Sequence, residues 1–176
     1  MRRAWVPLLM LAACTSDPVL ESRTAALGSE DPAVPVGEDH RPGQPCVTCH
    51  QPSGASDRHF ALAGTVLWGP VKLQGVAGAR VEILDARPGP LPPRVVTTNC
   101  AGNFFIDASD DLTFPLRVRV VAKGKTRDMR SPIFRERSCA GCHESERSPS
   151  SPGPVLLLGK EEEAKTPYVP PAECAQ

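Results

Sequence analysis

The feature that most constrains this chain is the pentapeptide Cys-x-x-Cys-His, which occurs twice. It occupies residues 46–50 and residues 139–143 of the 176-residue sequence. Two thiols one helical turn apart can each form a thioether with a vinyl group of haem, and the next residue can ligate the iron with its imidazole. The repeat therefore predicts two covalently attached c-type haems. The expected thioether residues are Cys46, Cys49, Cys139 and Cys142, and the expected proximal iron ligands are His50 and His143.

A Cys-x-x-Cys pair can also belong to a zinc site or a redox-active dithiol. A zinc site built from both pairs would use four thiolates and leave His50 and His143 without a role. A thioredoxin-like dithiol would need a βαβ context, which the sequence does not show. Haem is attached to such motifs outside the cytoplasm, so an export signal also favours the haem interpretation.

The first fourteen residues have the pattern of an export signal. Arg2 and Arg3 precede an apolar stretch, residues 4–13, which is too short for the roughly 20 residues that span a bilayer. The stretch ends in Leu-Ala-Ala-Cys, which resembles a bacterial lipobox with Cys14 as the lipidated residue. An ordinary secretory signal cut near Ala13 is the alternative. We expect an exported protein anchored by lipid in the envelope of a bacterium, in the periplasm or at the outer membrane.

The seven cysteines can be divided among these roles. If Cys14 takes lipid and four cysteines take haem, only Cys100 and Cys174 remain. Two leftover cysteines in an oxidising compartment suggest a disulfide, although two unrelated thiols also fit the count. We therefore expect a bond between Cys100 and Cys174.

The charge balance argues against a nucleic-acid partner. The chain has 20 basic and 20 acidic side chains, and removal of the signal would take away Arg2 and Arg3. Haem propionates would make the protein more acidic still. The sequence has no basic patch and no aromatic-rich nucleic-acid motif. The expected partners are other envelope electron carriers or redox proteins and, through the lipid, the membrane.

Composition divides the remainder of the chain. Residues 14–45 are rich in Pro, Asp, Glu, Ser and Gly without an apolar period, which predicts a flexible tether. Residues 46–59 would form the first haem-binding segment and residues 60–138 a folded domain. The second motif, residues 139–143, would precede a tail, residues 144–176, in which the acidic run 161–163 is typical of a solvated surface.

The folded domain has the pattern of short strands separated by Gly, Pro and Asn. Alternating apolar and polar residues, as in Val-Glu-Ile at 81–83, indicate a sheet with one buried face. Tight turns are expected at residues 98–103 and 123–125. The sequence predicts a mainly β protein, a small antiparallel β-sandwich. The candidate strands are residues 60–68, 79–85, 94–98, 103–107, 116–122 and 126–134.

Three blocks of this domain, residues 64–66, 75–83 and 97–104, resemble the carboxypeptidase regulatory-like domain. That domain is a transthyretin-like β-sandwich, and the resemblance covers about residues 60–134. It implies a non-catalytic scaffold or binding module. The whole arrangement is similar to exported bacterial cytochrome-type lipoproteins in which two haem motifs flank such a sandwich.

Strand parity predicts where the two motifs lie. Six antiparallel strands between them would return the chain to its starting end, so His50 and His143 should lie at one end of the sandwich. The turn that carries Cys100 should lie at the opposite end. Residues 155–158 could add a seventh strand that brings Cys174 toward Cys100.

Each haem iron can take a sixth ligand, and methionine raises the potential relative to histidine. His40 and His59 are the two histidines that the motifs leave over, and Met129 is the rival. The alternatives are two solvated surface imidazoles, a methionine that fills a gap in the core, or an open sixth position.

The sequence thus predicts a lipid-anchored di-haem cytochrome c that performs outer-sphere electron transfer and is not an enzyme. Two other functions stay open. A haem peroxidase or reductase would need a vacant distal pocket with acid–base residues, for which no candidate set is visible. A cell-surface binding or haem-sensor module would use the sandwich for recognition.

Overall fold

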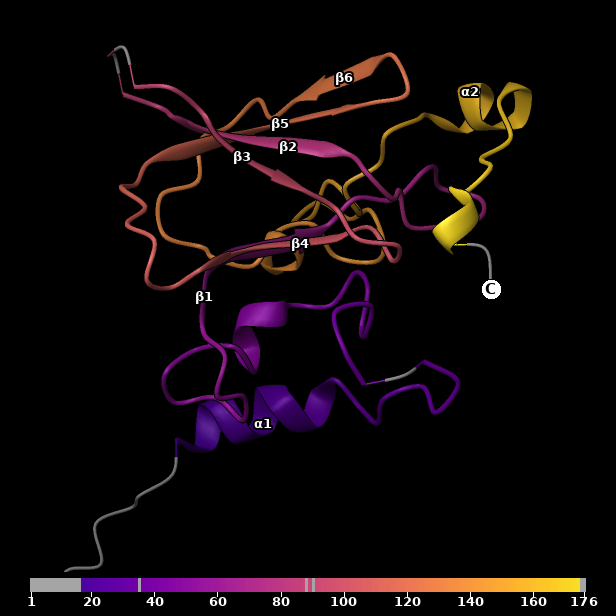
Figure 1. Cartoon of the computed structure of the whole chain (residues 1–176). Coiled ribbons are helices and arrows are strands. Elements are labelled where there is room, and N and C mark those ends of the chain that lie inside the picture. Colours follow the sequence, from indigo (N-terminus) through magenta and orange to yellow (C-terminus); the bar gives the residue numbers. More distant parts are fainter. Residues whose placement is uncertain (1–16, 35, 88, 90, 175–176) are drawn as a thin grey trace, which may run out of the picture.

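The computed structural model describes residues 17–34, 36–87, 89 and 91–174. The predicted export signal and Cys14 lie outside these residues. Within them, six strands form two antiparallel sheets that pack face to face, with the N-terminal segment beneath the smaller sheet (Figure 1). The prediction of a mainly β protein with a small antiparallel β-sandwich is therefore confirmed.

The smaller sheet pairs β1 with β4, and the larger sheet has the order β3-β2-β5-β6. Every pairing between these strands is antiparallel. The bounds are β1 (Phe60–Thr65), β2 (Arg80–Asp85), β3 (Arg94–Thr97), β4 (Asn103–Asp107), β5 (Leu116–Ala122) and β6 (Lys125–Asp128).

The core lies between the two sheets, and β1 is buried along its whole length. Leu62 of β1 and Ile106 of β4 face Val81 of β2 and its neighbours in one apolar cluster. On the other side, Ala63 and Phe60 pack against Val47 of the first motif. Because both sides of β1 are covered, its sequence is almost continuously apolar and lacks the alternation of a half-exposed strand.

The prediction of a flexible tether is wrong for the described part of residues 17–45. Helix α1 (Pro18–Ala26) begins at Asp17, whose carboxylate accepts from the N–H groups of Val19 (2.9 Å) and Leu20 (3.2 Å). Leu20 is buried, and α1 contacts the first motif. Asp17 caps the helix, and Leu20 is its one buried residue.

The expected strand at residues 126–134 is also too long. Strand β6 ends at Asp128, and beyond it only Ile133 returns to pair with Leu116 as an isolated bridge. Pro132 lies between them and has no N–H to donate to a ladder. The chain therefore leaves the sheet before it reaches the second motif.

The C-terminal tail pairs with the segment that follows β1 rather than extending the larger sheet. Leu67 donates to the carbonyl of Val155 (2.9 Å), and Leu157 donates to the carbonyl of Leu67 (2.8 Å), in a parallel arrangement. Leu157 and Leu158 are fully buried in the core. The expected seventh strand is therefore a short parallel pairing.

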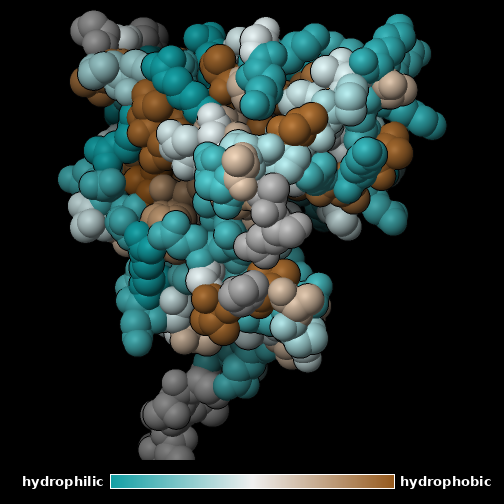
Figure 2. Space-filling view, turned by 45° about the vertical axis from the view of Figure 1, so that its right-hand side comes forward, coloured by the Kyte–Doolittle hydropathy of each residue, from teal (hydrophilic) through white to brown (hydrophobic). Residues whose placement is uncertain are grey.

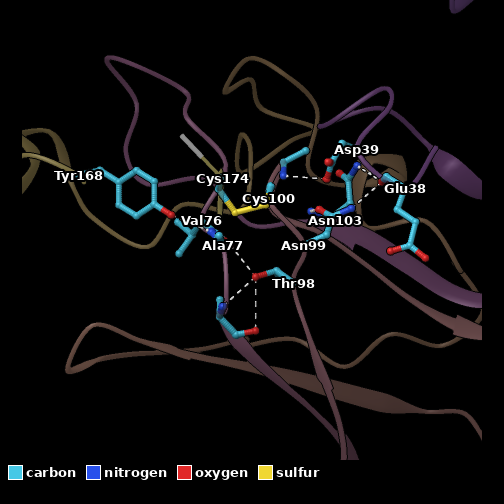
Figure 3. The surroundings of a disulfide bond; sticks show 12 residues. Glu38, Asp39, Val76, Ala77, Thr98, Asn99, Cys100, Asn103, Tyr168 and Cys174 are labelled. Atoms are coloured by element: carbon cyan, nitrogen blue, oxygen red, sulfur yellow. Dashed lines mark hydrogen bonds between the residues drawn. A yellow bond between two sulfur atoms is a disulfide. The ribbon is translucent and has the colours of Figure 1, made fainter. Parts of the chain in front are cut away.

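The tail ends at a disulfide that joins Cys174 to Cys100, with the Cα atoms 5.3 Å apart (Figure 3). Nearby, the hydroxyl of Tyr168 accepts from the N–H of Ala77 (2.9 Å). The structure thus pairs the two cysteines that lipid and haem would leave over, and closes the tail onto the turn after β3.

The acidic run 161–163 is a solvated surface only in part, because Glu161 is exposed but Glu163 is buried. The run forms half of helix α2 (Lys160–Lys165), and the carboxylate of Glu163 accepts from the N–H groups of Val71 (2.8 Å) and Lys72 (3.0 Å). Glu162 forms ion pairs with Lys125 (3.0 Å) and Arg127 (2.8 Å) of β6. The run therefore attaches the tail to β6 of the larger sheet and to the loop that contains Val71 and Lys72.

Among the described residues, no helix is long and apolar enough to cross a bilayer. Hydrophobic residues appear as separate brown patches among hydrophilic ones on the face shown in Figure 2. The large hydrophobic side chains left exposed are Val19, Val36, Val71, Leu73, Leu91, Val95, Phe134 and Val169.

Candidate haem-binding site

The two pentapeptides adopt the same backbone turn. Each begins with a short 3₁₀ turn, η1 (Cys46–Thr48) in the first motif and η2 (Cys139–Gly141) in the second. In the first motif, the N–H groups of Cys49 (3.2 Å) and His50 (3.0 Å) donate to the carbonyl of Cys46. In the second, the N–H groups of Cys142 (3.1 Å) and His143 (2.8 Å) donate to the carbonyl of Cys139. Each motif is thus one closed turn with its histidine at the end.

Both motif histidines are fixed in the same way. Nδ1 of His50 lies 2.8 Å from the carbonyl oxygen of Arg58, and Nδ1 of His143 lies 2.8 Å from that of Gly153. Because a carbonyl can only accept, Nδ1 carries the hydrogen in each ring and the lone pair lies on Nε2. Metal-ligating histidines commonly donate their other ring nitrogen in this manner.

The loop after each motif folds back onto it. In the first motif, the carbonyl of Cys49 accepts from the N–H of Ser56 (3.1 Å). In the second, the carbonyl of Cys142 accepts from the hydroxyl of Ser151 (2.9 Å), which is buried. These hydrogen bonds place each loop beside the histidine of its motif, so that a carbonyl of the loop can accept from Nδ1.

Aromatic stacking holds the ring of His50 in addition. Phe60 stacks on it at 4.1 Å between centroids, and Phe105 stacks on Phe60 at 4.6 Å. The guanidinium of Arg58 lies 4.2 Å from the centroid of Phe105. Burial lowers the pKa of His50, and the hydrogen bond to the carbonyl of Arg58 opposes part of this shift. The nearby charges of His40 and Arg58 lower the pKa further. The neutral imidazole, which is the form that ligates metals, is favoured.

The first cysteine of each motif is more enclosed than the second. Burial raises the pKa of the Cys46 thiol to about 11 and that of Cys139 to about 12, so both thiols are neutral near pH 7. Cys142 is exposed and Cys49 half-buried, and none of the four forms a disulfide. All four thiols are therefore left for thioether bonds.

The two motifs lie side by side against β1. The N–H of Val47 donates to the hydroxyl of Ser138 (2.9 Å), and the N–H of Ala63 donates to the carbonyl of Arg137 (2.9 Å). Ala63 and Ser138 form a parallel bridge at the edge of the smaller sheet. The structure therefore brings the motifs together, as strand parity predicts, but beside β1 and under the smaller sheet rather than beyond the end of the sandwich.

Gly64 permits the close approach of the second motif. A Cβ atom at this position would lie 2.5 Å from Sγ of Cys139 and 3.1 Å from a ring carbon of Phe104. Such distances are well inside van der Waals contact. The absence of a side chain in β1 thus makes the space that Cys139 fills.

A groove of about 550 Å³ opens between α1 and the two motifs. Its walls include Leu20 and Val47 and the exposed side chains of Arg23, Arg135 and Arg137. The volume is in the range of small-molecule and cofactor sites, and arginine is well suited to bind carboxylates such as haem propionates. Glu136 and Glu144 also line this groove, whereas none of the four motif cysteines and neither motif histidine does. The fit to haem therefore rests on the thiols and imidazoles of the motifs and not on this groove.

The three candidate sixth ligands lie in different places. The ring of His40 lies 5.8 Å from that of His50 between centroids. The carbonyl of His59 accepts from Ala108 (2.9 Å) at the start of β1. Met129 donates its N–H to Val118 (2.9 Å) on the larger sheet, whereas both motifs contact β1 of the smaller one. The structure thus brings His40 to the first motif and leaves Met129 on the other sheet.

Several residues that hold the site have no clear signal in the sequence. Ser138 precedes a helical turn, as capping residues do, yet its hydroxyl binds the other motif rather than its own turn. Arg58 and Gly153 contribute only carbonyl oxygens to the histidines. Gly64 could have been noticed only as a glycine inside a strand pattern, which often marks a close approach.

A scan against protein-family models finds no match, and a search of curated proteins finds no significant relative. In the part of the chain that the structure describes, no three or more His, Cys, Asp or Glu side chains are gathered as a site for a free metal ion.

Proposed function

We propose that this chain is an exported, lipid-anchored di-haem cytochrome c that transfers electrons in the envelope of a bacterium. One observation carries the proposal. The two motifs share one backbone turn, and in each the histidine donates Nδ1 to a carbonyl at 2.8 Å and so turns its lone pair to Nε2. Two pentapeptides without a common role would have no reason to share this arrangement.

When bound, haem supplies the one-electron redox chemistry, and the chain supplies attachment, orientation and surroundings. Cys46 and Cys49 would attach the first haem and Cys139 and Cys142 the second. His50 and His143 would ligate the irons. The hydrogen bond between Val47 and Ser138 holds the two motifs side by side, which suits electron transfer between the haems and on to another envelope carrier.

Haem content tests the proposal directly. The full chain is expressed in a host that exports it and has the c-type haem attachment machinery, and covalent haem is measured per polypeptide. We expect two haems in the wild type. We expect one haem in Cys46→Ala/Cys49→Ala and one in Cys139→Ala/Cys142→Ala. Each double variant is the matched control for the other, because each leaves the other motif intact.

Absence of covalent haem from the wild type under these conditions would refute the proposal, and so would binding of zinc in its place. Transfer is tested separately by the rate at which a reduced periplasmic cytochrome reduces the ferric protein. Fast reduction of both haems supports an electron carrier, whereas turnover of peroxide or nitrite would indicate an enzyme.

Anchoring is tested at Cys14, which lies outside the described residues. We expect the wild type to take up labelled fatty acid and to sediment with membranes. In Cys14→Ser, both properties should be lost while the haem content per exported chain stays the same. Membrane association in Cys14→Ser would contradict the lipid anchor and leave the haem proposal untouched.

A further inference from the structure

We infer that His40 is the sixth ligand of the first haem and lies opposite His50 on its iron. The inference rests on the proposed function, since it needs a haem on residues 46–50. It selects one of three spare side chains, His40, His59 and Met129, and makes the first haem a bis-histidine haem.

The first observation is the distance between the two rings. The centroids of His40 and His50 are 5.8 Å apart, and the ring planes are inclined by 33°. Metal–nitrogen bonds of ~2.0 Å, together with the size of the imidazole ring, put two imidazoles on one metal roughly 6 Å apart between centroids. The pair is therefore spaced nearly as two ligands of one iron would be.

The second observation is the hydrogen bonding of the His40 ring. Its Nδ1 is hydrogen-bonded to the carbonyl of Gly37, just as Nδ1 of His50 is bonded to the carbonyl of Arg58. Both rings therefore carry their lone pair on Nε2. The ring of His59 makes no hydrogen bond to any described residue, so nothing selects its tautomer in this way.

The third observation is that the backbone around His40 is held from β4. The side-chain amide of Asn103 donates to the carbonyls of His40 (3.0 Å) and Glu38 (3.1 Å), and Asn103 is itself buried. The next anchor is Gly43, whose N–H donates to the hydroxyl of Thr65 in β1 (2.8 Å). His40 is thus fixed relative to β1, the strand against which the first motif lies.

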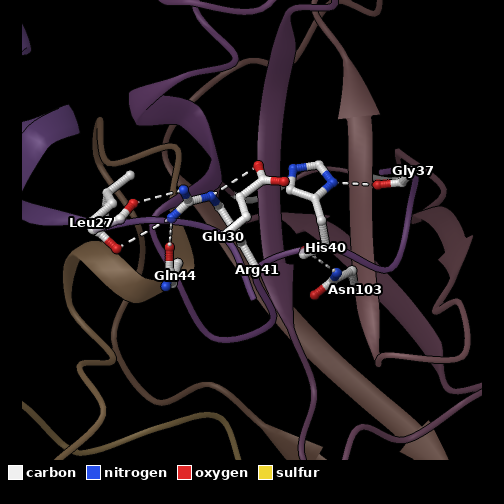
Figure 4. Close-up of polar contacts among 8 residues, drawn as sticks. Leu27, Glu30, Gly37, His40, Arg41, Gln44 and Asn103 are labelled. Atoms are coloured by element: carbon white, nitrogen blue, oxygen red, sulfur yellow. Dashed lines mark hydrogen bonds and ion pairs between the residues drawn. The ribbon is translucent and has the colours of Figure 1, made fainter. Parts of the chain in front are cut away.

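Arg41, the next residue, completes this support (Figure 4). Its guanidinium donates to the carbonyls of Leu27 (3.2 Å) and Gly28 (2.8 Å) and pairs with Glu30 (3.1 Å). Arg41 has φ +51°, a left-handed backbone conformation that is costly for a residue other than glycine. Such a conformation persists only where surrounding bonds enforce it, and here it sets the direction of the chain at His40.

The ligand is tested on the ferric holoprotein by EPR and optical spectroscopy, with covalent haem measured on the same samples. In the wild type we expect a low-spin bis-histidine signal from the first haem. In His40→Ala, one haem should become high-spin and the reduced protein should bind one more CO per chain. Added imidazole should restore the low-spin signal. His59→Ala is the matched control and should keep the wild-type spectrum.

A second variant keeps the test informative if His40→Ala folds poorly. In His40→Met, one haem should stay low-spin, show a methionine–iron charge-transfer band and have a raised potential, because methionine raises the potential relative to histidine. A purely structural role for His40 would produce neither the band nor the rise.

Two results overturn the ligand assignment while leaving the proposed function intact. The first is full haem content with unchanged spin state and CO binding in His40→Ala, and the second is conversion to high spin in His59→Ala instead. Absence of covalent haem from the wild type would overturn the proposed function itself, and the ligand assignment with it. The haem measurement on each sample separates these cases.

Discussion

The two motifs share a sequence and a backbone turn, but different parts of the molecule hold them. The first lies between α1 and β1 (Figure 1), and the ring of His50 packs on Phe60 and lies near that of His40. The second continues from residues that pair with the edge of β1, and Cys139 fills the space beside Gly64. The pentapeptide therefore supplies the chemistry of attachment, whereas its surroundings decide how each haem would be enclosed and ligated.

The largest effect is expected from a substitution at Gly64, which should affect the second motif and not the first. In Gly64→Val, the new side chain would overlap Cys139, whose Sγ would lie 2.5 Å from the Cβ. We expect loss of haem from the second motif, retention on the first, and destabilisation by about 2 to 3 kcal/mol. Mass spectrometry of tryptic peptides measures haem on each motif, and urea unfolding measures stability.

Gly89→Val is the control, because a Cβ at Gly89 would have no atom within 4 Å. It should leave both haems and the stability unchanged. Equal loss of haem from both motifs in Gly64→Val would show that they do not respond independently and would break the comparison.

The next effect concerns the bond that joins the motifs. In Ser138→Ala, the buried N–H of Val47 would lose its acceptor, which lies at 2.9 Å. A buried donor without a partner costs about 2 kcal/mol, so urea unfolding should show destabilisation of that size. Hydrogen exchange should become faster in both motifs. Ser53→Ala, at an exposed serine, is the control, and equal behaviour of the two variants would mean that the bond does not couple the motifs.

How far the sequence predicts this site depends on how local its causes are. The motifs follow from five adjacent residues, and strand β5 follows from alternation within about six residues. In β2 the expected exposed face is wrong at Glu82, which is buried beside Val81 and Ile83. The ordered structure of residues 17–45 does not follow from any local pattern. It depends on Asn103 and Thr65, which lie far along the chain and bind backbone groups near His40. A composition rich in polar residues therefore does not distinguish a flexible segment from one that distant residues hold in place.

The placement of the two motifs is a second case in which local sequence patterns predict only part of the structure. Counting strands brings residues 46–50 and 139–143 to the same region, because antiparallel order is a topological property. The pairing of Ala63 with Ser138 at the edge of β1 is a matter of contact, and no count reveals it. The buried role of Glu163 was missed for the same reason, since its partners Val71 and Lys72 belong to a distant loop.

A smaller effect is expected at the cap of α1, which contacts the first motif. In Asp17→Ala, the helix would lose the acceptor of its Val19 and Leu20 N–H groups, a loss of about 1 kcal/mol. We expect faster hydrogen exchange in α1 and in residues 46–50, with residues 139–143 unchanged. Val19→Ala, at a side chain that is 59% exposed, is the control. A change that is equal in both motifs would show that α1 does not belong to the first motif alone.

The smallest effect is a pH dependence of the tail that follows the second motif. Hydrogen bonds and ion pairs from Lys125, the N–H of Gly159 and Arg127 lower the pKa of Glu162 from 4.5 to about 2. Because the pKa is lower in the folded state, the stabilisation is complete above about pH 4.5 and is lost as the pH falls toward 2. The contribution is small because the group is exposed and solvent screens it. Acid should therefore loosen α2 before it loosens α1.

Thermal unfolding and hydrogen exchange between about pH 5 and pH 2 measure this difference. In Glu162→Gln, the decrease of Tm with falling pH should be shallower than in the wild type, because one titrating carboxylate is gone. Glu161→Gln is the control, since Glu161 is exposed on the same helix and forms no ion pair with a described residue. If exchange in α1 and α2 rises together as the pH falls, the acid response belongs to the whole protein. If α2 responds first, the attachment of the tail that follows the second motif is sensitive to acid, and the helix beside the first motif is not.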